Sequence, residues 1–324
     1  MATFTKGTPV IVAEGLFKSY GDTKAVRDLS FEAWAGSVFA LLGPNGAGKT
    51  TTINMLTTLL PIDQGRASVA GFDLTSRPEA VRQVIGLAGQ AAAVDEKLTA
   101  RENLDLFGRL YKIPKTERKL RVEELVDGFR MGAYADRTVS TYSGGQRRRL
   151  DVVASLIAKP LALFLDEPTT GLDPRSRVEL WDEIRGLADG GTAIVLTTQY
   201  LEEADRLADY VLIMDEGRAV ATGTARELKD DLKRDVLEVH FASEEDLGRA
   251  VQALEGFADD YGTDPTARQL TIPVIGGSAS SLRLLRRIED WGIPVVDFHY
   301  RRPTLDDVFL THTYGATDQL ESTK

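Results

Sequence analysis

The stretch Gly43-Pro44-Asn45-Gly46-Ala47-Gly48-Lys49-Thr50 decides the fold, because its spacing matches the pattern G-x-x-x-x-G-K-[ST] of a phosphate-binding loop. An apolar segment, Ser37–Leu42, precedes the loop and predicts a strand, and Lys49–Leu60 after it predicts a helix. The glycines allow backbone amides to converge on phosphate oxygens, and the helix N-terminus adds its positive dipole end. A chance glycine turn with a surface lysine is the alternative, and the flanking strand and helix argue against it.

The side chains of this loop predict the roles of its members. We expect the Lys49 ammonium to contact the β- and γ-phosphates of ATP. The Thr50 hydroxyl is suited to Mg²⁺, a hard cation that prefers oxygen ligands. We include Thr51, the next residue, among the predicted nucleotide contacts.

A second apolar segment ends in two carboxylates. Leu161–Leu165 predicts a buried strand, and Asp166 and Glu167 follow it directly. Ligand sites of α/β proteins lie at the carboxyl ends of the strands, so Asp166 is a candidate Mg²⁺ ligand and Glu167 a candidate general base. Two acids after an apolar run are often only a charged strand end, and the phosphate-binding loop is what makes the interpretation specific.

Strand-like and helix-like segments alternate from about Val10 to Thr224, which predicts an α/β domain with a largely parallel sheet. A mostly helical insertion, Arg101–Phe129, lies inside a predicted helical subdomain at about 91–158. The remaining predicted strands are Val84–Ala88, Ala193–Thr197 and Val211–Asp215, and the remaining helices are Pro174–Ala188 and Leu201–Ala208.

The composition changes after about Leu228, where the charged run 229–235 (KDDLKRD) is turn-like and predicts a hinge. We therefore expect a first domain at 1–230, a small α/β domain at 231–315 and a flexible tail at 316–324. The predicted elements of the second domain are Val236–Phe241, Glu244–Leu254, Gln269–Val274, Ser280–Asp290, Val295–Tyr300 and Leu305–Leu310.

The composition of the 324 residues excludes several classes of site. There is no cysteine, so disulfides, thiolate metal sites and a cysteine nucleophile are ruled out. A formal net charge of −10 argues against a protein whose main partner is nucleic acid. No segment approaches the roughly 18 consecutive apolar residues of a membrane helix, and the N-terminus lacks the apolar core of a signal peptide.

A second anion site is predicted at Ser143-Gly144-Gly145-Gln146, where a hydroxyl, small residues and a helix start occur together. One bound nucleotide does not need two phosphate-binding loops from the same chain. We therefore expect this segment to contact a nucleotide held by a second copy of the chain, in a head-to-tail dimer.

Residues 10 to 225 resemble the ABC ATPase family, because they contain the family's sequence motifs in the family's order. GPNGAGKT resembles the Walker A loop, LALFLDE the Walker B strand and YSGGQ the signature, with Tyr142 in place of the usual leucine. The resemblance implies that Gln90, in GLAGQ, is the Q-loop glutamine and a third Mg²⁺ contact. It also implies that Asp173 belongs to the D-loop and that Tyr20, in KSYG, stacks on adenine.

One position departs from the family pattern. Gln199 stands where the family usually has a histidine, and we predict that its amide senses the γ-phosphate. This variant, with RRRLD, DEPTTGLDPRSR and LDDVFL, resembles the daunorubicin/doxorubicin resistance ATP-binding subfamily. The resemblance implies ATP-driven export of a hydrophobic drug or antibiotic, with a lipid or other substrate as the alternative. It also implies a separate polytopic permease contacted by Ala91–Phe107, and a peripheral location on the cytoplasmic side of the cell membrane.

Other interpretations remain for parts of the chain. Non-transport ABC ATPases that act on ribosomes resemble tandem proteins with two phosphate-binding loops, whereas this chain has one. Repair ATPases carry coiled coils or zinc modules, and a non-catalytic module would not need Lys49, Asp166 and Glu167 together.

Arg147–Arg149 form ion pairs or solvated positions more readily than a phosphate patch. The three histidines are expected to be structural or surface residues: His240, His299 and His312.

Overall fold

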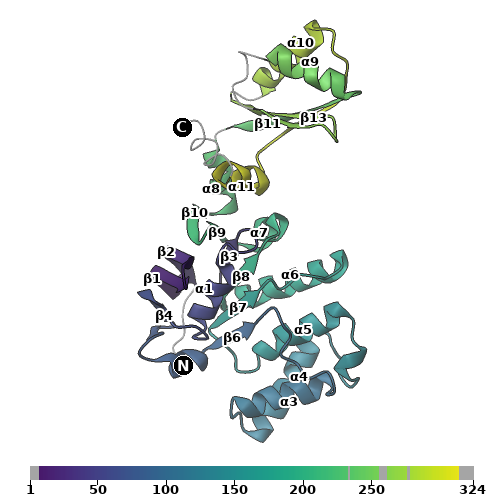
Figure 1. The fold of residues 1–324 in the computed structure, drawn as a ribbon. Coiled ribbons are helices and arrows are strands. Elements are labelled where there is room, and N and C mark those ends of the chain that lie inside the picture. Colours follow the sequence, from purple (N-terminus) through teal and green to yellow (C-terminus); the bar gives the residue numbers. More distant parts are fainter. Residues whose placement is uncertain (1–6, 233, 255–260, 276–277, 314–324) are drawn as a thin grey trace. The chain divides into compact units, whose positions relative to one another are not determined.

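The computed structural model describes residues 7–232, 234–254, 261–275 and 278–313 (Figure 1). The chain divides into two compact units, Met1–Ala225 and Arg226–Lys324. The second unit thus begins at 226 rather than at 231, because helix α8 (Ala225–Asp231) occupies the start of the predicted hinge. The interpretation of residues 229–231 as a turn was wrong: this charged run holds no glycine or proline to interrupt a helix. The predicted tail at 316–324 lies outside the described residues.

A six-stranded sheet forms the centre of the first unit, in the order β10-β9-β3-β8-β7-β6. All neighbouring strands are parallel except β10, which is antiparallel to β9. The five predicted strands agree with the observed ones to within a residue or so at each end, and the sixth strand, β10, was not predicted. Their bounds are β3 (Val38–Leu42), β6 (Ile85–Ala88), β7 (Ala162–Asp166), β8 (Ala193–Thr198), β9 (Tyr210–Asp215) and β10 (Arg218–Gly223).

A second, antiparallel sheet in this unit was missed by the sequence analysis. It runs in the order β2-β1-β4-β5. The register between β1 and β2 shifts between Ala13 and Leu16, and Gly15 there has a φ of 56°. This irregularity breaks the alternation of apolar and polar residues by which a strand is found in a sequence. The strands are β1 (Pro9–Tyr20), β2 (Thr23–Trp34), β4 (Gln64–Val69) and β5 (Phe72–Asp73).

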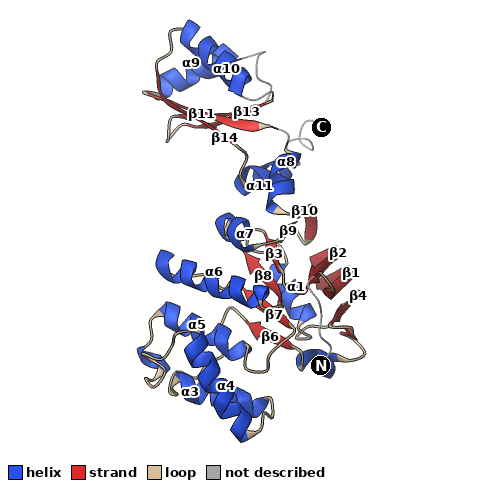
Figure 2. Ribbon diagram, turned by 180° about the vertical axis from the view of Figure 1, so that it is seen from behind, coloured by secondary structure: helices blue, strands red, loops and turns tan. Residues whose placement is uncertain are grey.

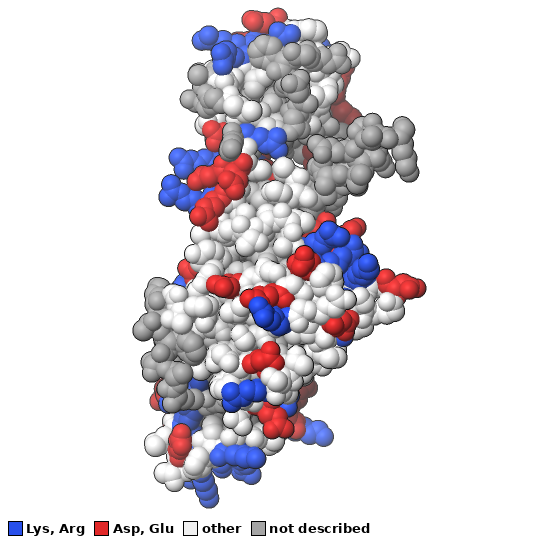
Figure 3. All heavy atoms as spheres, turned by 90° about the vertical axis from the view of Figure 1, so that its left-hand side faces the viewer, with Lys and Arg blue, Asp and Glu red and all other residues white. Residues whose placement is uncertain are grey.

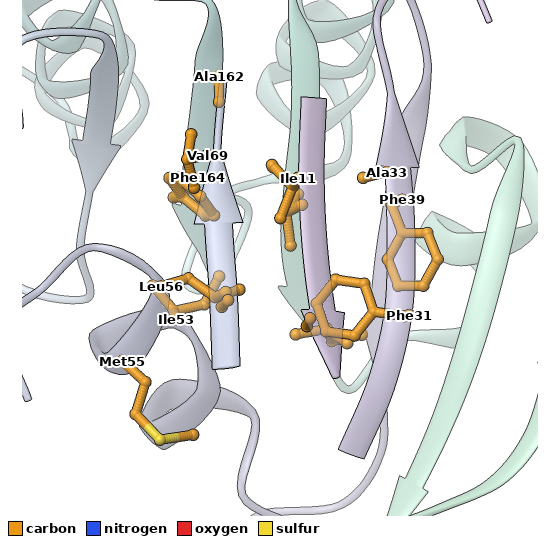
Figure 4. Close-up of a cluster of buried hydrophobic side chains, with 14 of the residues drawn as sticks. Ile11, Phe31, Ala33, Phe39, Ile53, Met55, Leu56, Val69, Ala162 and Phe164 are labelled. Carbon is orange, nitrogen blue, oxygen red and sulfur yellow. The ribbon is translucent and has the colours of Figure 1, made fainter. Parts of the chain in front are cut away.

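Helix α1 (Lys49–Leu56), which follows the phosphate-binding loop, packs between the two sheets. Figure 4 shows Ile53 and Leu56 of this helix beside Val69 of β4 and Phe164 of β7. Removing each such large side chain from water contributes about 1.5–3 kcal/mol, so the position of α1 is strongly fixed. The helix ends four residues before the predicted Leu60, because Thr57 closes it and Thr58 takes a left-handed φ of 62°.

Helices α6 and α7 lie on the opposite face of the six-stranded sheet from α1, and α3, α4 and α5 lie beyond its β6 edge (Figure 2), whereas Val81 of α2 packs into the same apolar cluster as α1. Three helices, α3 to α5, lie within the predicted subdomain at 91–158, and a turn separates α3 from α4. The bounds are α2 (Pro78–Arg82), α3 (Ala100–Leu110), α4 (Lys115–Gly128), the short 3-10 helix η1 (Val139–Thr141), α5 (Gly144–Ser155), α6 (Pro174–Asp189) and α7 (Leu201–Leu207).

The second unit is a four-stranded antiparallel sheet in the order β12-β13-β11-β14, with α9 and α10 packed against it. Its apolar core is separate from that of the first unit. All the elements predicted from the sequence are present, and β12 is an additional strand. Their bounds are β11 (Asp235–Phe241), α9 (Glu244–Leu254), β12 (Gly262–Asp264), β13 (Gln269–Val274), α10 (Ser278–Asp290), β14 (Val295–Arg301) and α11 (Leu305–Thr313).

Among the described residues, no helix combines the length and the apolar character needed to cross a bilayer.

The separate core of the first unit leads to a prediction about truncation. A chain ending at Asp231 should still fold and bind ATP, because every phosphate-binding motif precedes Leu228. Thermal unfolding followed by circular dichroism should show ATP raising the midpoint in both the truncated and the full chain. Loss of ATP binding by a truncated chain that keeps its native spectrum would mean that the second unit completes the site.

Candidate functional site

The phosphate-binding loop, Gly43–Thr50, joins β3 to α1 in a conformation that depends on glycine. Gly48 has a φ of 100°, and a Cβ atom there would lie 2.2 Å from the Ala25 carbonyl oxygen. Any larger residue would therefore be strained and would also collide with the backbone. The loop begins where the Gly43 amide donates to the Thr198 carbonyl at 3.2 Å, so it is tied to the end of β8.

Lys49 lies inside this loop and is only 4% exposed. Its ammonium donates to the carbonyls of Gly43 at 2.8 Å and Pro44 at 2.9 Å, and it lies 3.9 Å from Glu167 Oε1. Burial lowers the pKa of Lys49, while the charges of Glu167 and Asp166 oppose that shift. The geometry holds a cation at the phosphate-binding loop, beside the carboxylates at the end of β7.

A hydrogen-bond network joins the three predicted Mg²⁺ ligands. The Thr50 hydroxyl donates to Asp166 Oδ1 at 3.2 Å, and Gln90 Nε2 donates to the same hydroxyl at 3.1 Å. The Thr197 hydroxyl donates to the same Asp166 oxygen, Oδ1, at 2.5 Å. Residues from α1, β7, β8 and the loop after β6 thus meet at one edge of the sheet.

These donors fit a hard divalent cation. Thr50 and Asp166 offer oxygen atoms, and Gln90 offers one if its amide is turned over, since the nitrogen and oxygen of an amide are assigned from their contacts. Within the described ranges there is no cluster of three acidic, histidine or cysteine side chains that could hold a metal ion. A cation here would therefore take its other ligands from phosphate and water, as Mg²⁺ at nucleotide sites does.

Glu167 adopts a backbone conformation that is unfavourable for its residue type. Its φ is 50°, in the left-handed region, which costs about 1–3 kcal/mol for a residue other than glycine. Two bonds to Thr197 hold it there, because the Glu167 amide lies 2.9 Å from the Thr197 hydroxyl and 3.2 Å from its carbonyl oxygen. The Thr170 hydroxyl donates to the Glu167 carboxylate at 3.2 Å. The turn directs the carboxylate of Glu167 toward Lys49.

Three further predicted residues lie around this network. Gln199 follows β8 directly, and the pairing of Leu42 with Thr198 sets it beside the start of the phosphate-binding loop. Thr51 is the third residue of α1 and is half-buried. Tyr20 ends β1 with its side chain 49% exposed, which leaves a ring face open to solvent.

The signature residues and the D-loop residue Asp173 lie at two helix starts. Ser143 caps α5: its hydroxyl accepts from the Gln146 amide at 3.2 Å, and the Gln146 side chain accepts from the Ser143 amide at 3.1 Å. Asp173 caps α6 by accepting from the amides of Arg175 and Ser176. A Cβ atom on Gly145 would approach Ser176 Oγ to 2.7 Å, so the two helix starts are in close contact.

The structure does not bring the signature residues or Asp173 into the network around Lys49. Where the chain is described, Ser143, Gly144, Gly145, Gln146 and Asp173 share no hydrogen bond or ion pair with the phosphate-binding loop. Within one chain, the loop site and the signature site are therefore two separate anion-binding features.

The arginine run after the signature forms ion pairs, as the sequence analysis favoured. Arg147 pairs with Glu96, Arg148 with Asp151, and Arg149 with Glu179 and Glu183. Arg148 is however buried rather than solvated. The burial of Arg148 was not predicted from the sequence, and neither was the role of Thr197, which bonds to both Asp166 and Glu167. The only available signal for Thr197 was its place at the end of a predicted strand.

The comparisons with known proteins agree with this geometry. Residues 26–170 match the family model for ABC transporters, and residues 223–313 match the model for the ATP-binding protein DrrA1-3-like C-terminal domain. A daunorubicin resistance ATP-binding protein, DrrA2 of Streptomyces coeruleorubidus, is 46% identical over 96% of this chain and 97% of its own length.

Other relatives and solved structures show the same likeness. The Nod factor export ATP-binding protein I of Ralstonia nicotianae is 36% identical and covers 94% of each chain. A solved ATP-binding subunit of an ABC transporter is 28% identical, with a TM-score of 0.62 over 69% of this chain and 93% of that one. Both family models, the full-length relatives and the meeting of Lys49, Thr50, Asp166 and Glu167 at one sheet edge therefore place this chain among the ATP-binding subunits of ABC transporters, with the DrrA-type C-terminal domain.

Proposed function

We propose that this chain hydrolyses ATP to drive export of a hydrophobic drug or antibiotic through a separate membrane permease. The network that joins Lys49, Thr50, Gln90, Asp166 and Glu167 carries the proposal, because it gathers the phosphate-binding and acid–base groups of an ATPase at one edge. The names of its 46%-identical relatives, which are drug resistance proteins, support the substrate class.

The proposed binding site uses the backbone amides of Gly43–Thr51, with Lys49 directed at the phosphates. Thr50, Gln90 and Asp166 would hold Mg²⁺, which neutralises phosphate charge when bound. The exposed ring of Tyr20 offers the flat apolar surface on which adenine can stack.

The chemical step needs a base and a means of alignment. Glu167 accepts a proton from a water molecule as that water attacks the γ-phosphorus, and the bond to the bridging oxygen of ADP breaks. Gln199 donates a hydrogen bond to the γ-phosphate and keeps phosphate and water in line. The left-handed turn at Glu167 supports this role, since strained backbone is retained where function requires a particular direction.

A head-to-tail dimer would use the second anion site. The start of α5 at Ser143–Gln146 presents a helix dipole and a hydroxyl that the phosphate-binding loop of the same chain does not use. In the proposed dimer this segment covers the γ-phosphate of a nucleotide on the partner chain, and Asp173 lies at the same interface. Opening and closing of the dimer then drives the permease.

The permease is proposed to contact Ala91–Phe107, on the exposed side of the loop after β6. A cavity of about 190 Å³ opens beside Ala93 there, and its lining includes the apolar side chains Leu59, Phe107 and Tyr111. Leu59 is 61% exposed and Tyr111 38% exposed, so this region offers apolar surface to a partner. The chain would then lie peripherally on the cytoplasmic side of the cell membrane, held by the permease.

Two alternatives are kept for the test. A relative that is 36% identical to this chain is named for the export of Nod factor rather than of a drug. Export of a lipid or another substrate is therefore the second candidate. A non-transport ABC ATPase acting on nucleic acid is the third. On the face shown in Figure 3, basic and acidic groups are interspersed. A protein that binds nucleic acid instead needs a continuous basic surface to attract the phosphate backbone.

The proposed function is tested with the chain and its permease in lipid vesicles. ATP turnover should rise when daunorubicin is added, and the drug should cross the bilayer only with ATP. Glu167→Gln should retain ATP binding and lose turnover by on the order of 10²–10⁴-fold, because an amide cannot accept the proton. Failure to recover any membrane subunit with the chain would contradict a transport role. Stimulation by lipids but not by drugs would favour the second substrate class.

Gln199 generates a prediction about kcat. Gln199→Ala should lower kcat by on the order of 10- to 100-fold with little change in ATP affinity, because a transition-state donor is lost. Gln199→His should stay active and should alone gain a pH dependence near the imidazole pKa. The measurement is kcat against pH for the three proteins with permease present. Wild-type turnover by Gln199→Ala would show that the γ-phosphate is sensed elsewhere.

The shared site generates a prediction about mixed dimers. A Ser143→Arg chain and a Lys49→Ala chain should each capture ATP poorly as homodimers. In the mixed dimer one composite site keeps both native residues, so ATP capture should return at one of the two sites. Nucleotide retained on dimers separated by size measures this recovery, with each single variant as control. Capture no better than in the homodimers would count against the head-to-tail arrangement.

A further inference from the structure

Arg148, on α5, binds the backbone on both sides of Glu167. It donates from Nη2 to the Asp166 carbonyl at 2.8 Å and from Nε to the Pro168 carbonyl at 2.9 Å. The side chain is 10% exposed, so these bonds form away from water. A single guanidinium therefore fixes the carbonyl groups of the residues immediately before and after Glu167.

The same guanidinium also reaches the loop that carries Gln90. Arg148 Nη1 donates to the Gly89 carbonyl at 2.5 Å, immediately before Gln90. The other end of this loop is held by Asp151, one turn further along α5, whose Oδ1 accepts from the Ala93 amide at 2.7 Å. Residues 89 and 93 are thus attached to one helix, while Gln90 between them bonds to Thr50.

Arg148 and Asp151 depend on each other as charges. Arg148 Nη1 lies 3.4 Å from Asp151 Oδ2, and the Asp151 side chain is 2% exposed. Burial raises the pKa of Asp151, and Arg148 and the Ala93 amide oppose that shift. Removing either partner would leave an uncompensated charge in the interior, which is strongly destabilising.

We propose that Arg148 and Asp151 are positioning residues that hold Gln90 and Glu167 in a fixed relation to each other. A displacement of the loop 89–93 is passed through the Arg148 guanidinium to the peptides that orient the Glu167 carboxylate. The inference rests on the proposed function, in which this loop faces the permease and Glu167 is the base. It goes beyond that function because neither residue contacts ATP, Mg²⁺ or water in the proposed mechanism.

The competing explanation is that the pair only stabilises the fold, and a double variant separates the two. Arg148→Met alone leaves Asp151 unpaired, and its unfolding midpoint should fall. Arg148→Met with Asp151→Asn removes both charges of the pair, keeps an acceptor for Ala93, and should recover much of the midpoint. The double variant still lacks every bond to Gly89, Asp166 and Pro168. A positioning role therefore predicts that stability returns and turnover does not.

The readouts are made on the full chain with ATP and Mg²⁺. The double variant should lose on the order of 10- to 100-fold in kcat, with KM for ATP nearly unchanged, because alignment rather than binding is lost. Amide exchange in peptides covering 89–93 should be faster than in the wild type, which reports release of the loop.

Arg121→Met is the matched control. Arg121 is 13% exposed, pairs with Glu124 and donates to the Leu156 carbonyl at the end of α5 at 2.7 Å. The Arg121→Met variant therefore removes a similarly buried arginine that packs against α5, and it leaves the bonds to the loop 89–93 in place. Its midpoint should fall, while kcat and the exchange of 89–93 should stay at wild-type values.

The outcomes separate this inference from the proposed function. A double variant with a recovered midpoint and wild-type kcat, or with wild-type exchange at 89–93, would overturn the positioning role. If the permease fails to stimulate the wild-type chain, the export proposal is contradicted. A loss of basal kcat together with faster exchange in the double variant would still support the positioning role.

Discussion

The parallel pairing of β3, β8 and β7 is the constraint on which the rest of the site depends. It aligns Leu41 with Thr197 and Asp166 with Thr197, so three chain segments that are far apart in sequence end at the same level. Short hydrogen bonds between their terminal side chains then become possible. The Thr197 hydroxyl bonds to both Asp166 and the Glu167 amide, so the pairing of β7 with β8 fixes the positions of both residues in the site.

Local sequence patterns were sufficient to predict the phosphate-binding loop, the acidic strand end and the central parallel strands, because each is encoded by consecutive residues. The functions of Thr197 and Arg148 were not predictable in this way. Thr197 acts on Asp166, 31 residues away, and Arg148 bonds to Gly89, 59 residues away. Such contacts depend on the assembled sheet, and an arginine within an Arg-Arg-Arg run gives no local sign that it is buried.

The errors in the predicted fold have physical causes as well. The antiparallel sheet was missed because a bulge at Gly15 interrupts the alternation of β1, and α1 stops early because Thr58 leaves helical backbone space. The charged run at 229–231 was taken for a turn although its residues have adequate helix propensity. In each case the backbone conformation of one residue, or the surroundings of a short segment, decided the secondary structure against the average preference of its amino acids.

The capping box at the start of α5 determines which way a hydroxyl can act. Because Ser143 Oγ accepts from the Gln146 amide, one of its lone pairs is occupied and its proton is left to be given away. The cap therefore leaves the hydroxyl proton available for donation to a bound group at the positive end of a helix dipole. Alanine would lose the cap and the donor together, whereas aspartate would keep the cap and repel any anion that arrives.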